Sequence, residues 1–178
     1  MTDGLPLTHS YNLARLGNAG DEVHFAADAG QLAAISRWAG LLSLQSLKVR
    51  VEIKKAGPNR FALDFHLDAG ITQSCVVTLE PVPSHLARHF QRELHFTGPS
   101  RHRPGTDEPG PAELVLDGEE EEAPEEIESL HYDLAGPVLE EFVLSLEPYP
   151  RRPGVEFSPP SDPVRPAESP FAVLKALK

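Results

Sequence analysis

The sequence predicts an α+β fold, a twisted antiparallel β-meander of four to six strands packed by two helices. Two observations support this prediction. Residues 47–55 and 60–68 alternate apolar and polar side chains on either side of a turn, which is typical of a hairpin with one buried face. Residues 28–42 and 133–146 instead carry apolar residues at helical spacing. At 178 residues and 40% hydrophobic content, the chain is long enough for one such core.

The meander extends beyond the hairpin. The hairpin turn itself is "AGPN", residues 56–59, which is rich in turn-forming residues. The same alternation continues in "ITQSCVVTLE" and "RHFQRELHF", and these segments predict two further strands. An earlier short strand is predicted from "EVHFAAD". We therefore expect at least four strands joined in sequence order.

Each predicted helix carries a start signal. Asp28 is placed to cap the first helix, and Gln31 three residues later completes a capping box. Its apolar face is predicted to consist of Leu32, Ile35, Trp38 and Leu42. The second helix is predicted within residues 130–148, with Asp133 as its cap and Pro137 in its first turn.

Charged residues are unevenly distributed along the chain. Residues 1–100 hold nine basic and nine acidic side chains, whereas residues 101–178 hold seven and eighteen, so the net charge of -11 arises entirely there (7 − 18). We expect residues 1–97 to form the sheet core with one helix. The remaining predicted parts, in order, are an acidic, Pro/Gly-rich disordered insertion at 98–129, the helix at 130–148, an extended Pro-rich linker at 149–168 and a C-terminal docking motif at 169–178.

The sequence contains none of the common catalytic motifs. It has no Gly-rich phosphate loop, no Gly-x-Ser-x-Gly elbow and no HExxH, and its carboxylates cluster in sequence predicted to be flexible. Paired acid–base catalysis needs rigid carboxylates in different environments. We therefore expect no enzyme activity, no cofactor and no small-molecule substrate.

We expect neither the one cysteine nor the histidines to have a catalytic or metal-binding role. Cys75 falls in register with Val77 on a predicted strand, which predicts a small buried side chain rather than a nucleophile. His85, His89 and His95 lack a recognisable metal-ligand spacing, so we expect surface histidines and no bound metal. No signal peptide and no apolar run of membrane-spanning length is visible, and a cytoplasmic protein without membrane contact is expected.

Two clusters of basic residues are candidate RNA contacts. The larger one follows the hairpin and consists of Lys48, Arg50, Lys54, Lys55 and Arg60; the smaller one is Arg151 and Arg152 beside Tyr149. The alternative is that the outer face of the sheet is charged simply because it is solvated. A net charge of -11 opposes general nucleic-acid binding, so any RNA contact must be local or made through a basic protein partner.

Residues 169–178, "SPFAVLKALK", form an amphipathic motif after a Pro-rich stretch. Burying its large apolar side chains contributes roughly 1.5–3 kcal/mol each, whereas ordering the backbone costs about 1–2 kcal/mol per residue. The two nearly cancel, so the motif is expected to order only on a receiving surface, either its own sheet or a partner. The predicted anchors are Phe171, Leu174 and Leu177, and the predicted charged rim is Lys175 and Lys178.

Three segments resemble the YceD family. They are "CVVTLEPV" at 75–82, "LEPYPRRPGVEF" at 146–157 and "SPFAVLKALK" at 169–178, of which the last is the most specific. Members of this family are known as large ribosomal RNA subunit accumulation proteins. The resemblance implies a non-enzymatic assembly factor that supports accumulation or processing of large-subunit ribosomal RNA.

These features leave three functional hypotheses. The first is a factor that binds the precursor of the large ribosomal subunit through its RNA or through an early basic ribosomal protein. The second is an acidic adaptor or carrier for a basic partner, without RNA contact. The third, an enzyme, requires a convergent pocket that the sequence does not indicate.

Overall fold

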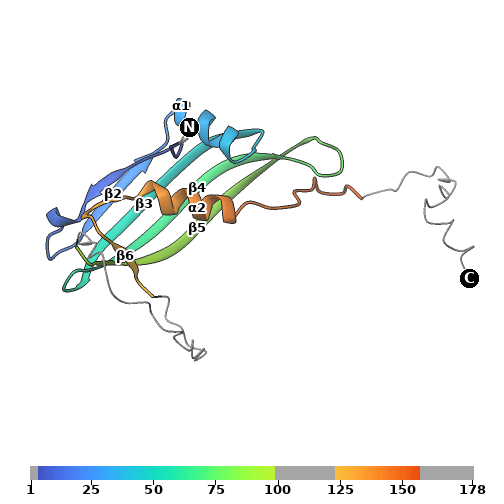
Figure 1. The fold of residues 1–178 in the computed structure, drawn as a ribbon. Coiled ribbons are helices and arrows are strands. Elements are labelled where there is room, and N and C mark those ends of the chain that lie inside the picture. Colours follow the sequence, from blue (N-terminus) through green and yellow to red (C-terminus); the bar gives the residue numbers. More distant parts are fainter. Residues whose placement is uncertain (1–3, 99–122, 157–178) are drawn as a thin grey trace, which may run out of the picture.

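The computed structural model describes residues 4–98 and 123–156, and it has the predicted α+β architecture (Figure 1). Residues 99–122 of the predicted insertion, residues 157–168 of the predicted linker and the predicted docking motif at 169–178 lie outside the described residues. In chain order the elements are β1 (Ser10–Asn12), the short 3-10 helix η1 (Leu13–Arg15), β2 (Asp21–Ala26), α1 (Ala29–Trp38), β3 (Ser43–Gly57), β4 (Arg60–Ser74), β5 (Pro81–Phe96), β6 (Glu125–Ile127), β7 (His131–Asp133) and α2 (Ala135–Leu144).

The main sheet has the order β2-β3-β4-β5-β6. Strands β2 to β5 follow one another as an antiparallel meander, as the alternating sequence predicts. Strand β6 adds to β5 in parallel and lies within the segment predicted as insertion. It is ordered by pairing with the end of β5 and by burying Ile127, which is only 8% exposed. A second, two-stranded sheet pairs β1 with β7.

Strands β3 and β4 form a long hairpin with one buried face. Val51 lies opposite Phe65, and both side chains are fully buried. At the turn, Asn59 adopts a positive φ of 57°, a conformation that asparagine tolerates better than most residues. Between the two register shifts of this pair, the even-numbered residues from 48 to 54 on β3 and from 62 to 68 on β4 point to the opposite face, which carries the polar side chains.

Helix α1 has the predicted capping box. The Asp28 carboxylate accepts the backbone N–H of Gln31 over 2.8 Å, and the Gln31 side chain accepts the N–H of Asp28 over 2.9 Å. The predicted apolar face is only partly buried. Ile35 is fully buried, whereas Trp38 is 48% exposed and Leu42, beyond the end of the helix, is 54% exposed.

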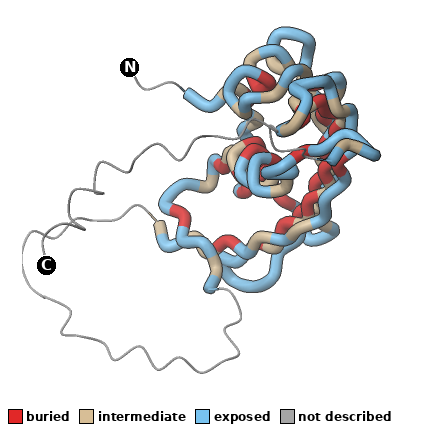
Figure 2. The backbone as a smooth tube through the Cα atoms, turned by 90° about the vertical axis from the view of Figure 1, so that its right-hand side faces the viewer, coloured by how far each residue is buried: buried red, intermediate tan, exposed pale blue. Residues whose placement is uncertain are grey.

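Helix α2 covers the apolar face of the main sheet (Figure 1). Figure 2 shows buried positions along the side of the curved sheet that faces this helix. The helix begins at Ala135, and Asp133 still serves its first turn by accepting the N–H of Ala135 over 3.1 Å. Pro137 lies in the first turn, where its missing N–H costs nothing. The buried residues of α2 are Ala135, Pro137, Val138, Leu139 and Phe142.

The start of the described chain is fastened to the start of α2. The backbone N–H of His9 donates to the Asp133 carboxylate over 2.6 Å, and Leu134 N–H donates to the carbonyl of His9 over 2.9 Å. Leu13 N–H donates to the carbonyl of Leu130 over 2.8 Å. These bonds hold η1 against β7, and Leu13 of η1 is buried in the core.

The segment "ITQSCVVTLE", residues 71–80, does not form the separate strand that its alternation predicts, because residues 71–74 continue the hairpin strand β4. Strand β4 stops at Ser74, and residues 75–80 form the turn that leads into β5. Leu79 adopts a positive φ of 61° there, and its N–H donates to the carbonyl of Cys75 over 2.9 Å. The alternating apolar side chains of this stretch imitate a strand, but the local hydrogen bonds close a turn instead.

Candidate functional site: the polar face of the sheet

The polar face of β2 to β5 is the main candidate site. Strand register assembles it into rows that cross all four strands. The central row, each residue directly opposite the next, is His24, Arg50, His66 and His89. The adjacent row is Glu22, Glu52, Asp64 and Gln91. A band of cationic and imidazole groups thus lies beside a band of acidic and amide groups.

A shallow hollow of about 520 Å³ lies over the central row. The residues of the polar face that line it are His24, Lys48, Arg50, His66, Asp68, Ala87 and His89. Arg88 also borders it, but its side chain points to the other side of the sheet, where it donates to the Ser145 hydroxyl over 2.7 Å. The hollow is therefore lined by Lys48, Arg50 and three imidazoles, and Nε2 of each imidazole lies within 3.1 Å of a carboxylate oxygen.

Acidic neighbours balance much of the predicted basic cluster. Arg50 lies 3.7 Å from both Glu22 and Glu52, and Lys54 lies 3.2 Å from Glu52. Lys48 forms no ion pair within 4 Å in the part of the chain that the structure describes. Of the two polar-face cations that line the hollow, Lys48 and Arg50, Lys48 is therefore the one better placed to meet an outside anion.

The structure places four of the five hairpin cations on one face, of which only Lys48 and Arg50 line the hollow. Lys48, Arg50, Lys54 and Arg60 occupy even-numbered positions and lie on the polar face. Lys55 has the opposite parity and borders a separate hollow with Leu13 and Asn59. The five residues therefore do not form one patch.

The second predicted basic site is engaged within the molecule. Arg152 donates to Glu80 over 2.6 Å, and this hydrogen bond together with the charge of Arg152 lowers the pKa of Glu80. The backbone N–H of Val76 donates to the carbonyl of Pro150 over 2.9 Å. Arg151 is exposed beside them. This site lies at the turn between β4 and β5, away from the hollow on the polar face.

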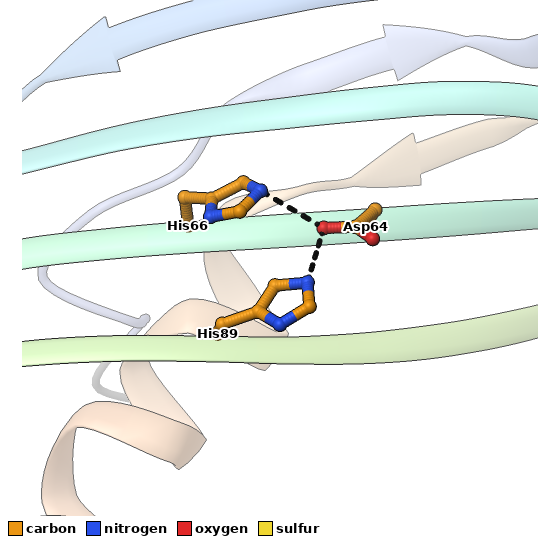
Figure 3. Close-up of side chains that lie close together, drawn as sticks. All are labelled: Asp64, His66 and His89. Carbon is orange, nitrogen blue, oxygen red and sulfur yellow. Dashed lines mark hydrogen bonds and ion pairs between the residues drawn. The ribbon is translucent and has the colours of Figure 1, made fainter.

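Two imidazole side chains of the polar face converge on a single carboxylate oxygen of Asp64 (Figure 3). Asp64 Oδ1 lies 3.1 Å from His66 Nε2 and 2.7 Å from His89 Nε2. The two imidazole rings are stacked, with centroids 4.5 Å apart. Burial raises the pKa of Asp64, but hydrogen bonds from Gln91 and His89 and the charges of both histidines outweigh burial and lower it overall.

The family model described as "Large ribosomal RNA subunit accumulation protein YceD" matches residues 63–178. The chain belongs to the YceD family. No curated protein and no solved structure matches the chain. Among residues 4–98 and 123–156, no helix is long and apolar enough to cross a membrane.

The YceD match covers some of the candidate residues and not others. It begins within β4, so it includes Asp64, His66, His89 and the two arginines of the second site. It does not include the hairpin cations, Lys48 to Arg60, which precede it. The predicted docking residues Phe171, Leu174, Lys175, Leu177 and Lys178 fall within the match but outside the described residues.

Cys75, at the head of one YceD-like segment, is fully buried as predicted, although in a turn rather than a strand. Hydrogen bonds from the Thr78 hydroxyl and from the backbone N–H groups of Arg152, Thr78 and Val77 lower the pKa of its thiol to about 6. The sulfur thus accepts bonds from both the turn and the segment after α2. Its position indicates a role in joining these two segments.

Sequence reasoning did not group the residues that the sheet brings together. His24, Asp64 and His66 were not predicted as site residues, because each is one polar residue in an alternating strand and no sequence spacing links them. His85, which was grouped with His89, instead lies 2.8 Å from Asp68. Four positions along a strand separate these two histidines by about 13 Å. The signal that was available is the hairpin register, which places His66 directly opposite His89.

Proposed function

We propose that this protein is a non-enzymatic, cytoplasmic factor for biogenesis of the large ribosomal subunit, and that it supports accumulation or processing of large-subunit ribosomal RNA by contacting precursor RNA. The observation that carries this proposal is the YceD family match over residues 63–178. The family description concerns RNA accumulation and specifies no reaction.

The hollow on the polar face supports a local phosphate contact. Lys48 and Arg50 stand at its floor beside His24, His66 and His89, and these side chains carry donors for phosphate oxygens. The adjacent acidic row limits the contact to the central row, because RNA phosphates are repelled there. A narrow cationic strip within an acidic protein favours a specific RNA site over general RNA affinity.

A second candidate is contact with an early basic ribosomal protein. The observation that favours it is the net charge of -11, which complements a basic partner. In that case the protein acts as an adaptor or carrier and RNA contact is absent. The motif at 169–178, with Phe171, Leu174 and Leu177 as anchors, is proposed as a docking element in either case.

Crosslinking in cells separates these candidates. RNA crosslinked to the full chain is sequenced, and proteins in the same pull-down are identified by mass spectrometry. The proposal expects crosslinks that map to large-subunit precursor RNA and cosedimentation with precursor particles when large-subunit assembly is stalled. A copurifying ribosomal protein without RNA crosslinks would favour the adaptor, and a protein found only in free fractions would contradict the contact with precursor RNA.

A further inference from the structure

The convergent side chains at the centre of the polar face are suited to more than hydrogen bonding. We propose that Asp64, His66 and His89 form a three-ligand site for a divalent transition-metal ion, with Zn²⁺ the best match. This proposal goes beyond the proposed function, because it concerns a ligand that the isolated protein would bind without RNA or ribosomal protein.

The distances fit such an ion. One ligand atom from each residue lies within 4.8 Å of the other two, and each imidazole Nε2 is within 3.1 Å of the Asp64 oxygen. Zinc binds imidazole nitrogen and carboxylate oxygen at about 2.0–2.2 Å, which places neighbouring ligand atoms roughly 3–4 Å apart. Small rotations of the two imidazole rings therefore bring all three atoms to bonding distance.

The strands hold the three residues in place. Asp64 and His66 are two residues apart on β4 and project to the same face, and His89 lies directly opposite His66 on β5. On the other face, the next cross-strand pair, Phe65 and Phe90, stacks with ring centroids 4.7 Å apart. This pair fixes the register that aligns the two histidines. Sites built on rigid strands of this kind need little reorganisation on binding.

Neighbouring groups support a cation. Gln91, opposite Asp64, donates to Asp64 Oδ2 over 2.9 Å and so leaves Oδ1 for the histidine side of the site. Glu52 lies opposite Asp64 on β3 and adds negative charge. The guanidinium of Arg50, which lies opposite His66, is 3.7 Å from Glu22 and from Glu52, so its charge is partly balanced.

The site is also accessible. The side chains of Asp64, His66 and His89 are 29%, 39% and 54% exposed, and two of the three, His66 and His89, line the hollow. A metal with three protein ligands on one side retains open positions on the solvent side, which water or a phosphate oxygen fills. Two imidazoles and one carboxylate are donors that Zn²⁺ and similar first-row ions accept.

The sequence-based expectation of no metal rested on other histidines. His85, His89 and His95 lie at different points along β5 and do not converge, and among the described residues only the Asp64 group brings three ligand atoms together. The competing explanation is that Asp64 simply accepts hydrogen bonds from both imidazoles. The two explanations differ in whether Zn²⁺ can replace the imidazole protons that are donated to Asp64.

The test uses the full chain, freed of any affinity tag and treated with a chelator, titrated with Zn²⁺ by calorimetry. The proposal expects one saturable equivalent, lost or weakened at least about tenfold in His66→Gln, His89→Gln and Asp64→Asn. The matched control is His85→Gln, because His85 also lies on β5 and also contacts a single carboxylate, Asp68, over 2.8 Å. It should bind Zn²⁺ as the wild type does.

Two further measurements make the result independent of how well one variant folds. Co²⁺ in place of Zn²⁺ should give absorption bands typical of a low-symmetry site with nitrogen ligands in the wild type and in His85→Gln. Zn²⁺ should raise the melting temperature of these two proteins and not that of His89→Gln, whose side chain is the most exposed of the three. Absence of a saturable equivalent, or equal weakening by His85→Gln and His89→Gln, would overturn the proposal.

Discussion

Arg152 donates to Glu80 over 2.6 Å, which links the segment after α2 to the turn between β4 and β5. The Val76 N–H bond to the carbonyl of Pro150 lies in the same place. Two segments far apart in sequence are thus joined by one ion pair and one backbone bond. This junction also surrounds the buried Cys75.

Replacing Arg152 by alanine should loosen this junction. We expect a small decrease in melting temperature at neutral pH, because the pair is solvent-exposed and therefore weak. The pKa of Glu80 is lowered by Arg152, so the pair's contribution is present above the ordinary glutamate pKa of 4.5 and is lost as pH falls through the lowered value. Thermal melts of Arg152→Ala and of Arg151→Ala, the neighbouring control, measure this. An equal decrease in both variants would contradict it.

Cys75 should make stability depend on pH. Its thiol has a pKa lowered to about 6 in the folded protein, against an ordinary value of 9.0. The contribution of the thiolate is therefore full above the unfolded value and disappears as pH falls through about 6. Urea unfolding of wild type and Cys75→Ala should differ more at about pH 9 than at about pH 5. A difference that does not change with pH would show that the sulfur acts only by packing.

Helix α2 offers a matched pair for testing the core. Phe142 is fully buried against the sheet, whereas Leu144, two residues later, is 80% exposed. Phe142→Ala should lower the free energy of unfolding by about 3–5 kcal/mol. Leu144→Ala should change it by no more than about 0.5 kcal/mol. Urea denaturation of both variants checks this, and similar losses would mean that α2 does not pack as described.

Lys48 should matter to RNA contact and Lys55 should not. The two residues lie on the same strand but on opposite faces. Lys48→Gln and Lys55→Gln each remove one positive charge, so they change the net charge equally. Lys48→Gln should weaken binding of large-subunit precursor RNA and reduce the slope of log affinity against log salt by about one. Filter binding at several salt concentrations measures both. Equal effects from the two variants would indicate a general charge effect instead.

The proposed docking motif can be tested without structural detail. Phe171→Ala and Leu174→Ala should reduce copurification of large-subunit components while leaving the melting temperature unchanged. The readouts are pull-down mass spectrometry and thermal denaturation of the full chain. Ser169→Ala, in the same motif but polar, is the control. A marked drop in melting temperature with the two apolar replacements would mean that the motif belongs to the core.

The regular elements could be predicted because their signals are local. The alternation in β3 and β4 and the capping box at Asp28 depend only on neighbouring residues, and both are present. Residues 75–80 misled the strand prediction, because their apolar alternation says nothing of the turn made at Leu79. Strand β6 has an acidic sequence without strand propensity, and pairing with β5 forms it nonetheless.

The candidate site was only partly predictable. Strand parity correctly places Lys48, Arg50 and Lys54 on one face. The acidic partners of these cations are set by the register of β3 with β2 and β4. The spacing of residues within β3 does not reveal that register. The convergence of His66 and His89 on Asp64 depends in the same way on a pairing between two strands. Residues 169–178 lie outside the described part and stay a prediction.

The pairing of His9 with Asp133, 124 residues apart in sequence, has a consequence for synthesis of the chain. Strand β1 leaves the ribosome early, but its partner β7 is made much later, after the β3–β4–β5 meander is complete. Contacts of such sequence separation form slowly. Leu7, Leu13 and Leu16, buried in the finished fold, therefore lack the contribution of β7 and α2 to their burial until residues 131–144 have been made. Until then the growing chain exposes apolar surface that the completed protein covers.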